Sequence, residues 1–300
     1  MRILIAGRTG QLATELLDRL PRDGHLVTAL EAPELDITKW ESIEEAVGRT
    51  NPDVIINAAA YTAVDRAEGD RDRAFLVNST GPALLGTITA LGGIPLVHLS
   101  TDYVFPGTGG APYDESAPPQ PISVYGASKL AGEHRALEAN PRTAILRTSW
   151  VCSPHGANFV KTMLRLGAEG EAVSVVADQH GAPTFAADLA DAIARMLPRL
   201  ARSPAGDPAF GIFHLTGAPH TTWHDFAEAI FAEAAVRRRP PPKLTAISTA
   251  EYPTLAQRPA DGRLDCGLIG RIHGIVPADW RLSLTQCLDT VLGPIAKDSA

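Results

Sequence analysis

Residues 2–20 read RILIAGRTGQLATELLDRL, and this stretch decides the fold. The apolar run at 2–6 has the length of a buried strand, and the pattern over 10–20 is that of an amphipathic helix. The glycine-containing turn GRTGQLA, at 7–13, joins the two directly. A strand, a glycine turn and a helix in this order are typical of the first unit of a dinucleotide-binding domain.

Two glycines and the residues around them define what this turn can bind. Gly7 permits the tight turn, and Gly10 lets the backbone approach a pyrophosphate. The N–H groups of Gln11 and Leu12 would face that pyrophosphate at the positive end of the helix. Ala13 stands where the usual fingerprint has a third glycine, and it is small enough for close packing of the helix on the sheet. The turn therefore predicts a cofactor site.

Further short apolar runs alternate with helical patterns along the first half of the chain. Expected strands lie at 25–30, 53–58, 95–100 and 143–150, and the segment 72–91 is expected to be helical. This alternation predicts an α/β, Rossmann-like, doubly wound parallel sheet with helices on both faces. Ligands of such sheets bind beyond the carboxyl ends of the strands, so the informative residues should follow the apolar runs.

After about residue 150 the pattern loosens, and a smaller carboxyl-terminal substrate-binding lobe is expected. We assign residues 1–150 to the dinucleotide-binding domain, with a returning segment at about 176–205. The lobe would comprise 151–175 and most of 206–300. Helices are expected at 156–170 and 186–200, and a strand at 211–217.

Composition narrows the class of protein. Among 300 residues, 45% are hydrophobic and 20% charged, and the formal net charge of -7 argues against a nucleic-acid partner. Cys152, Cys266 and Cys287 are widely spaced and form no CxxC motif, which indicates free thiols in a reducing compartment and no metal site. The apolar run at the amino terminus is too short for a signal peptide or a membrane span, and we expect no later stretch to be long enough for a span. We therefore expect a cytoplasmic enzyme.

The cofactor's identity stays open between NADPH and NADH. Glu31, just after the second expected strand, could accept a hydrogen bond from a ribose 2′-hydroxyl and so favour NADH. Arg8 could instead meet the 2′-phosphate of NADPH. Asp36 and Ile37, in the loop that follows, are placed to contact the adenine.

The segment VYGASKLAGE, at 124–133, carries a tyrosine and a lysine four residues apart, Tyr125 and Lys129. This spacing puts both side chains on one face of a helix. An ammonium group near a phenol lowers the phenol pKa from about 10 and makes tyrosine a usable proton donor. The hydroxyl of Thr101, in LSTDYVFPG at 99–107, ends the fourth expected strand and could steady a carbonyl oxygen. Together these groups could reduce a ketone by hydride transfer.

At this point the sequence resembles the extended short-chain dehydrogenase/reductases and, within them, the dTDP-4-dehydrorhamnose reductases over essentially the whole chain. The segments that carry the resemblance are GRTGQL, INAAAYTAVDRAE, VNSTGP, LSTDYVFPGTG, VYGASKLAGE, RTSWV, DQHGAPT, TTWHDFA and YPTLAQRPADGRLD. The resemblance implies reduction of the 4-keto group of dTDP-4-dehydro-6-deoxy-L-mannose by NADPH or NADH, giving dTDP-L-rhamnose. It also implies a nucleotide-sugar substrate and no metal in the chemistry.

The resemblance assigns roles residue by residue. Tyr125 would donate the proton, Lys129 would bind the nicotinamide ribose and tune Tyr125, and Thr101 would complete the triad. Besides these, the implied cofactor contacts are Gly7, Gly10, Gln11, Leu12, Glu31, Asp36, Ile37, Ala59, Ala60, Tyr61 and Thr62. The implied substrate contacts are Thr101, Asp102, Tyr103, Trp150 and Arg258, with Arg263 as a second candidate for the diphosphate.

Some positions depart from the family pattern. Asp261 and Gly262 stand where the family commonly has Asn-Ser, and Cys152 replaces a commonly larger residue near the pocket. Some members dimerise through carboxylates around magnesium. Glu15 matches one of these carboxylates, whereas the other two positions hold Ala187 and Thr290. No metal site is predicted, and a monomer or a homodimer is expected.

Two other functions fit the same features. The chain could be a non-catalytic regulatory subunit like the β-subunit of methionine adenosyltransferase, which shares this fold. It could also be a reductase or epimerase of another nucleotide sugar. The complete Thr101, Tyr125 and Lys129 set and Trp150 favour a catalytic function over the regulatory subunit.

Overall fold

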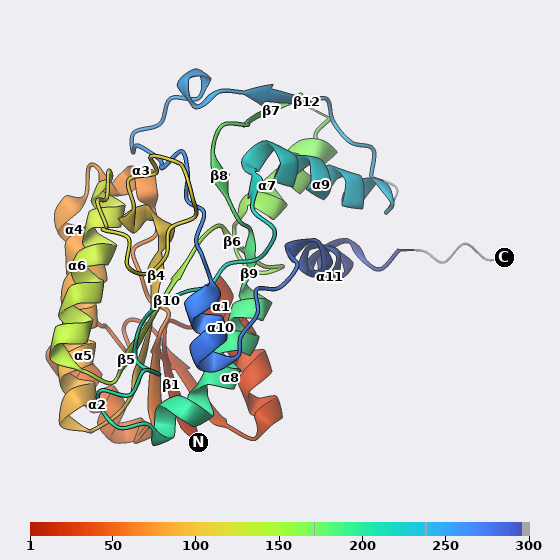
Figure 1. Ribbon diagram of the computed structural model, residues 1–300. Coiled ribbons are helices and arrows are strands. Elements are labelled where there is room, and N and C mark those ends of the chain that lie inside the picture. Colours follow the sequence, from red (N-terminus) through yellow and green to blue (C-terminus); the bar gives the residue numbers. More distant parts are fainter. Residues whose placement is uncertain (171, 238, 296–300) are drawn as a thin grey trace.

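The centre of the computed structural model, which describes residues 1–170, 172–237 and 239–295, is a six-stranded sheet (Figure 1). All neighbouring strands of this sheet run parallel. Its spatial order is β2 (Leu26–Leu30), β1 (Arg2–Ala6), β3 (Val54–Asn57), β4 (Leu96–Thr101), β5 (Thr143–Thr148) and β10 (Gly211–His214). The expected doubly wound parallel sheet is confirmed.

Helices cover both faces of the sheet (Figure 1). One face carries α1 (Gln11–Arg19), α8 (Ala186–Arg202) and α10 (Gly267–His273). The other side carries α2 (Trp40–Thr50), α3 (Val64–Ala67), α4 (Arg71–Phe75), α5 (Gly81–Leu91) and α6 (Val124–Ala139). Because the central strands are buried on both faces, each contains a short apolar run, which is why the apolar runs in the sequence located these strands well.

The strand order reverses between β1 and β3, and the crevice opens there. The chain leaves β1 at Gly7, whose φ of 98° suits glycine. A Cβ at this position would lie 3.2 Å from the backbone nitrogen of Ala59, which follows β3. Gly7 thus lets the two strand ends approach each other at the point where a doubly wound sheet binds its ligand.

The second half of the chain returns to the sheet twice. α8 packs on α1, and their apolar side chains share one core with the sheet. β10 then adds the outermost strand beside β5, and α10 packs near it. β10 and α10 therefore lie with the sheet, although they fall within the range 206–300 that we assigned mainly to the lobe. The division into a domain and a lobe stays a prediction.

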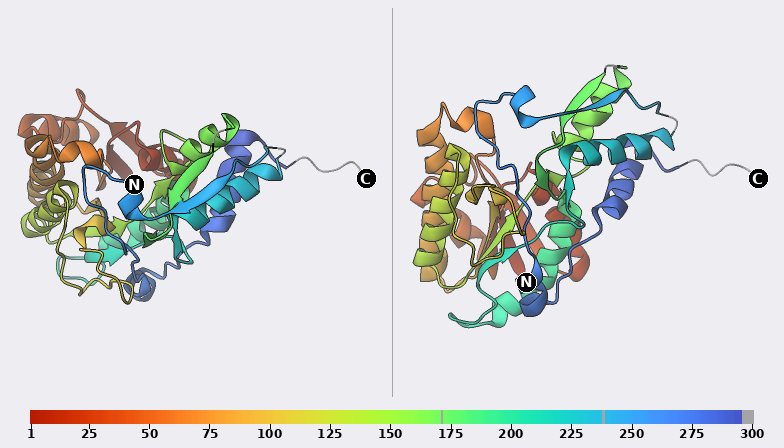
Figure 2. Two further views of the ribbon diagram at one scale, coloured as in Figure 1. Left: turned by 90° about the horizontal axis from the view of Figure 1, so that it is seen from above. Right: turned by 45° about the horizontal axis from the view of Figure 1, so that its top comes forward.

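The remaining helices form a lobe beside the carboxyl end of the sheet (Figure 2). A second core joins α7 (Phe159–Ala168), α9 (Trp223–Ala235) and α11 (Trp280–Leu292). Short strand pairs connect the lobe to the sheet: β6 (Val151–Cys152) with β9 (Thr184–Phe185), β7 (Val173–Val176) with β12 (Leu244–Ile247), and β8 (His180–Gly181) with β11 (Thr221–Thr222). Single helical turns lie at Leu20–Asp23, Asp102–Val104 and Thr249–Glu251.

The segment Arg71–Leu91 is helical throughout but not regular. A π-helical turn, Leu76–Thr80, separates α4 from α5 and turns Asn78 into the interior. The segment is long and apolar enough to cross a membrane by length and composition, so our expectation that no stretch reaches that length was wrong. Half of its most apolar window is buried, and α5 packs on α6, which explains its composition as that of a core helix.

Candidate active site

A cavity of about 560 Å³ opens at the carboxyl end of the sheet, between the sheet and the lobe. The turn before α1, the ends of β4 and β5, the helix α6 and the loop after β6 all contribute to its wall. Of the residues expected at the site, those that line it are Gly10, Gln11, Leu12, Ala60, Thr62, Thr101, Asp102, Tyr103, Tyr125, Lys129 and Trp150. One cavity thus brings together the glycine turn and the tyrosine–lysine pair, which are more than 100 residues apart in the sequence.

The first turn of α1 has the features of an anion site. The first N–H groups of a helix have no partner within the helix, and no side chain caps them in α1. A Cβ on Gly10 would meet no atom within 4 Å, which means that open space lies in front of the backbone there. Unpaired N–H groups, a helix dipole and open space fit the pyrophosphate of a dinucleotide.

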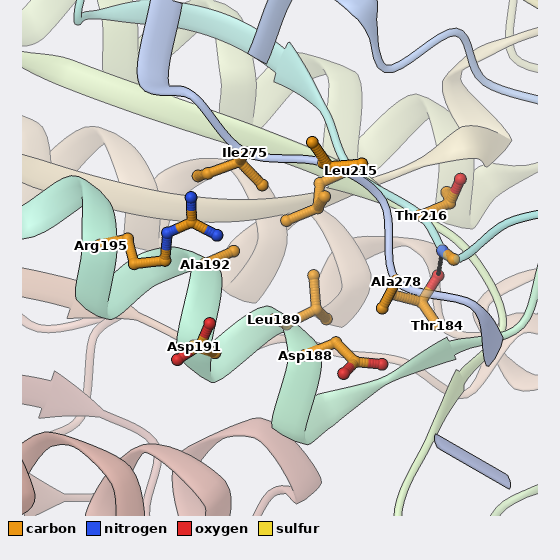
Figure 3. A pocket seen from close by; sticks show the side chains of 12 residues that line it. Thr184, Asp188, Leu189, Asp191, Ala192, Arg195, Leu215, Thr216, Ile275 and Ala278 are labelled. Carbon is orange, nitrogen blue, oxygen red and sulfur yellow. Dashed lines mark hydrogen bonds between the residues drawn. The ribbon is translucent and has the colours of Figure 1, made fainter. Parts of the chain in front are cut away.

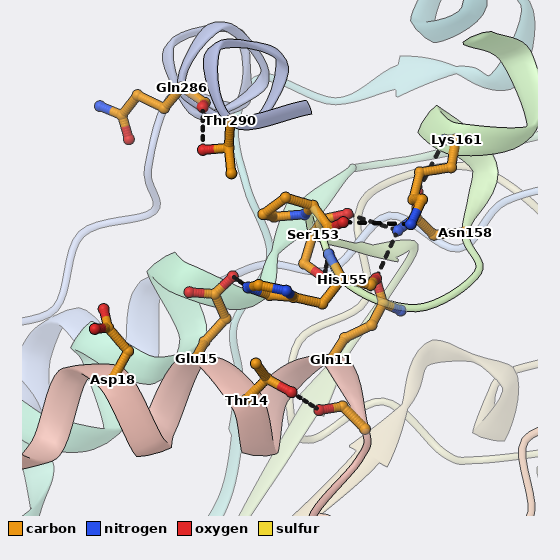
Figure 4. A network of polar contacts seen from close by, with 12 residues as sticks. Gln11, Thr14, Glu15, Asp18, Ser153, His155, Asn158, Lys161, Gln286 and Thr290 are labelled. Atoms are coloured by element: carbon orange, nitrogen blue, oxygen red, sulfur yellow. Dashed lines mark hydrogen bonds and ion pairs between the residues drawn. The ribbon is translucent and has the colours of Figure 1, made fainter. Parts of the chain in front are cut away.

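The side chain of Gln11 ties this turn to the loop that enters the lobe (Figure 4). Its Nε2 donates to the carbonyl of Val151 at 3.3 Å, and its Oε1 accepts from Ser153 Oγ at 3.1 Å and from Asn158 Nδ2 at 2.8 Å. The loop held in this way places Gly156 and Ala157 on the cavity wall. We expected only the backbone of Gln11 to act, because its side-chain partners lie about 140 residues away.

The residues expected near the adenosine lie at the rim. Glu31 accepts hydrogen bonds from the Thr9 hydroxyl and from the backbone N–H groups of Arg8 and Thr9, and these bonds lower the pKa of its carboxyl. The Arg8 guanidinium donates to Glu34 at 2.6 Å. Asp36 accepts from Thr38, which lowers its pKa although burial opposes this. Thr9 lines the cavity, whereas Arg8, Glu31 and Asp36 do not, so the cofactor contacts of these three stay predictions.

Of Ile37 and the residues expected after β3, only some line the cavity. Ile37 is buried and packs against Gly81, away from the cavity wall. Ala60 and Thr62 line the cavity, whereas Ala59 packs beside Gly7. The backbone N–H of Tyr61 donates to Asn78, and its hydroxyl donates to Asp70 at 3.1 Å. The π-helical turn described above therefore holds this segment in place through Asn78.

Tyr125 and Lys129 stand on the face of α6 that borders the cavity. Ser123 caps the helix by accepting from the Gly126 N–H at 3.1 Å. Lys129 is 2% exposed, and its Nζ donates to the carbonyl oxygen of Leu99 at 2.6 Å. Burial lowers the Lys129 pKa to about 8. The lysine is thus fixed against the end of β4, close to Thr101.

The pKa of Tyr125 differs from our expectation. We expected Lys129 to lower it, but burial raises it to about 12, and a hydrogen bond with Thr101 only partly offsets this. Burial is the main cause, and Lys129, whose Nζ donates to the Leu99 carbonyl, does not contribute to the shift. The phenol is therefore protonated at neutral pH, which is the form that a proton donor requires.

The substrate side of the cavity is built from the end of β4 and from two tryptophans. Asp102 is 3% exposed, and burial raises its pKa to about 7, although the Thr101 hydroxyl donates to it at 3.0 Å. The Tyr103 ring meets the Tyr125 ring edge to face, with centroids 5.6 Å apart. Trp150, at a φ of 47°, stacks on Trp223 at 3.7 Å between ring centroids. Trp223 also lines the cavity and was not among the residues we expected.

The two arginines expected to bind the diphosphate already have carboxylate partners. Arg258 donates to both oxygens of Asp65, at 3.1 and 2.6 Å, and does not line the cavity. Arg263 pairs with Asp261 at 2.6 Å. A side chain on Gly262 would collide with the Asp102 carboxylate, so glycine suits this position. Any role of these arginines toward substrate stays a prediction.

The position that matched a metal-binding carboxylate is used differently here. Glu15 lies 3.6 Å from the Nε2 of His155 (Figure 4), and burial raises its pKa. Thr290 donates its hydroxyl to the carbonyl of Gln286. In the described ranges, no group of three or more His, Cys, Asp or Glu residues could hold a metal ion.

A second hollow, between α8 and the segments around residues 216 and 276, is much smaller (Figure 3). Its volume is about 70 Å³, and Asp188, Asp191 and Arg195 are among its lining residues. This space is too small for a dinucleotide or a nucleotide sugar. We therefore assign the site to the larger cavity.

Comparison with known proteins identifies the family. The family model described as RmlD substrate binding domain matches residues 1–292. A dTDP-4-dehydrorhamnose reductase from Aggregatibacter actinomycetemcomitans is 42% identical over 287 residues, which cover 94% of this chain and 97% of the relative. The chain belongs to the dTDP-4-dehydrorhamnose reductase family. The resemblance seen in the sequence is thereby confirmed.

Solved structures of other family members share the fold. A dTDP-4-dehydrorhamnose reductase from Clostridium acetobutylicum superposes with a TM-score of 0.90 at 34% identity, covering 97% of this chain and 99% of the other. One from Bacillus anthracis, solved in complex with NADP, gives a TM-score of 0.87 at 36% identity, covering 96% and 99%. Membership in the dTDP-4-dehydrorhamnose reductase family thus extends over both the sheet and the lobe.

Proposed function

We propose that this protein reduces the 4-keto group of dTDP-4-dehydro-6-deoxy-L-mannose to give dTDP-L-rhamnose, using NADPH or NADH. The observation that carries the proposal is the shared cavity, which joins the glycine turn of α1 to Tyr125, Lys129 and Thr101. Its family relatives carry the name of this reaction, and one of them was solved with NADP.

In the proposed mechanism the residues of the cavity have defined roles. The dinucleotide supplies the hydride when it is bound. Tyr125 gives its phenolic proton to the oxygen that becomes the new hydroxyl, so that the ketone gains one hydride and one proton. Thr101 donates a hydrogen bond to that oxygen, and the Lys129 ammonium stabilises the tyrosinate that remains.

The protonation states suit reduction. Because burial raises the Tyr125 pKa to about 12, the phenol stays protonated at neutral pH until a charge develops next to it. A phenol with this pKa is a weak acid, so the nearby ammonium is needed at the moment of proton transfer. The residues that would hold the cofactor are Gly10, Gln11 and Leu12 at the pyrophosphate and Lys129 at the ribose.

The rest of the cavity fits a nucleotide sugar. Trp150 and Trp223 form an aromatic wall, and Asp102 adds a polar group beside Thr101. We assign Trp150, Asp102 and Tyr103 to the sugar, and Arg258 to the diphosphate if it exchanges Asp65 for the substrate. Three free cysteines, Cys152, Cys266 and Cys287, support a reducing cytoplasmic location, and the protein would act as a monomer or a homodimer.

The test follows the loss of NADPH and NADH absorbance with enzymatically prepared dTDP-4-dehydro-6-deoxy-L-mannose. A UDP-linked 4-keto sugar serves as the competing substrate. We expect rapid oxidation with the dTDP sugar and none with Tyr125→Phe, which should still bind the cofactor because only the hydroxyl is lost. Cofactor binding without turnover of any keto sugar would favour the regulatory-subunit reading, and turnover of the UDP sugar alone would favour another nucleotide-sugar reductase.

A further inference from the structure

Beneath the tyrosine–lysine pair, the sheet carries a row of buried polar side chains. Ser100 on β4, Arg147 on β5 and His214 on β10 are neighbours in register across three strands. Each is at most 5% exposed. A polar row across the middle of a parallel sheet is unusual, because both faces of such a sheet are normally apolar.

One carboxylate from α6 gathers this row. Glu133 is 0% exposed and accepts three hydrogen bonds from Arg147, at 2.9 and 3.1 Å from Nε and at 2.6 Å from the terminal nitrogen. It also accepts a hydrogen bond from the Ser100 hydroxyl. Arg147 in turn approaches His214 Nε2 at 3.4 Å and lies over the Phe105 ring. Glu133 therefore fastens α6 to two strands at once.

The place of Glu133 along α6 links this anchor to the reaction. Tyr125, Lys129 and Glu133 follow one another at intervals of four residues, so they lie along one face of the helix. Glu133 accepts a hydrogen bond from Ser100, which lies between Leu99 and Thr101 on β4. The Leu99 carbonyl accepts the hydrogen bond from Lys129. The lysine, its carbonyl partner and the strand-end threonine are thus all set by one buried contact.

A buried ion pair is not needed for stability alone, since apolar residues of similar volume often serve as well. Stability alone therefore does not explain why Glu133 and Arg147 are paired beneath Tyr125 and Lys129. Resting on the proposed function, we propose that Glu133 is a positioning residue that sets Lys129 beside Thr101 and supplies the negative charge that keeps its ammonium ionised. Arg147 and Ser100 hold Glu133 in the position from which it acts.

The charges around Lys129 agree with this role. Glu133 raises the Lys129 pKa, against the larger lowering by burial. The other ionisable groups on the surrounding elements are Tyr125 on α6, His98 and Asp102 at the end of β4, and Arg147 on β5. His98 is fully buried, and its pKa is lowered by burial and by Lys129, so it stays neutral and adds no positive charge. Asp102 titrates near neutral pH and stays the same in every variant below.

The test is the pH dependence of Glu133→Gln. Loss of the negative charge should lower the Lys129 pKa, so the alkaline limb of kcat/KM should move to lower pH by about 1 unit. Glu133→Asp keeps the charge, and its alkaline limb should stay at the wild-type position even if kcat falls. A merely structural role would instead reduce activity equally at every pH. An unshifted limb in Glu133→Gln would overturn the proposal.

Two further variants guard against loss of the fold. The double variant Glu133→Leu with Arg147→Met removes the pair without leaving an unpaired buried charge, so it should fold. Its limb should move in the same direction as in Glu133→Gln but by less, because the positive charge of Arg147 is lost as well. Glu233→Gln is the control, because it removes one of the two carboxylate partners of Arg237 in the lobe, far from Lys129 in the sequence. It should lower the melting temperature and leave the limb in place. A wild-type limb in a folded double variant would also overturn the proposal.

The same variants separate this proposal from the proposed function. The NADPH dissociation constant can be followed against pH without any sugar, because Lys129 would contact the cofactor directly. As pH rises, NADPH affinity should begin to weaken at a lower pH in Glu133→Gln than in the wild type. If the wild type turned over no keto sugar, the proposed function would fail, and this binding shift would still support or overturn the role of Glu133.

Discussion

The substitution Gly181→Ala tests how the wall of the substrate cavity is built. A Cβ at residue 181 would lie 2.6 Å from Cε2 and 2.7 Å from Cζ2 of Trp150. The indole would have to withdraw by about 0.8 Å to reach ordinary contact, and packed interiors accommodate such shifts poorly. The indole is also stacked on Trp223, with 3.7 Å between ring centroids, which restricts the directions in which it can move.

The expected cost follows from this confinement. Overpacking of this kind costs about 1–3 kcal/mol. If about 1.4 kcal/mol of that falls on sugar binding, KM for the nucleotide sugar should rise about tenfold. The NADPH dissociation constant should change little, because the glycine turn of α1 is not involved. Steady-state kinetics with the dTDP sugar and a separate NADPH titration measure the two effects.

A double-mutant cycle and a control make this prediction specific. Trp223→Leu removes the second wall, so adding Gly181→Ala should then cost less than it does alone. Gly48→Ala, in the exposed part of α2 where a Cβ would meet no atom within 4 Å, should leave both constants unchanged. An unchanged KM in Gly181→Ala would refute the view that Trp150 is held in place by these two neighbours.

Two other results are expected. Burial raises the Asp102 pKa to about 7 from an ordinary value of 3.8, so the folded state binds this proton more tightly than the unfolded state, and stability is lost as pH rises through that range. In thermal melts, the melting temperature of the wild type should fall relative to that of Asp102→Asn as pH rises between these values. A constant difference between the two proteins would contradict the pKa shift. Gln11→Ala should raise the NADPH dissociation constant about tenfold, because the hydrogen bonds to the 153–158 loop are lost. Gln286→Ala, at an exposed position, is the control. Equal NADPH affinities in the two variants would show that the Gln11 side chain does not support the cofactor site.

The sequence predicted what depends on neighbouring residues. The turn at Gly7 and Gly10 and the helical spacing of Tyr125 and Lys129 are local patterns, and the structure places both at one cavity. The four central strands, β1, β3, β4 and β5, could be located because burial on both faces demands apolar runs.

The rest depends on contacts between distant segments. Trp223 faces Trp150 across 73 residues, and Arg258 is paired with Asp65 across 193. No local pattern reveals such partners, because they are set by how the lobe folds back on the sheet. The pKa of Tyr125 was misjudged for a related reason, because it is raised by burial, and burial depends on how distant segments pack around the phenol.

The packing of α8 on α1 has a consequence for the folding of the chain. Leu12 and Leu16 of α1 share their core with Leu189 and Ile193 of α8, which the chain reaches only after it has begun the lobe. A fragment that ended near residue 150 would expose this apolar face to water. The sheet and the lobe are therefore interdependent during folding, and newly made chains must complete about two thirds of their length before the cofactor helix is covered.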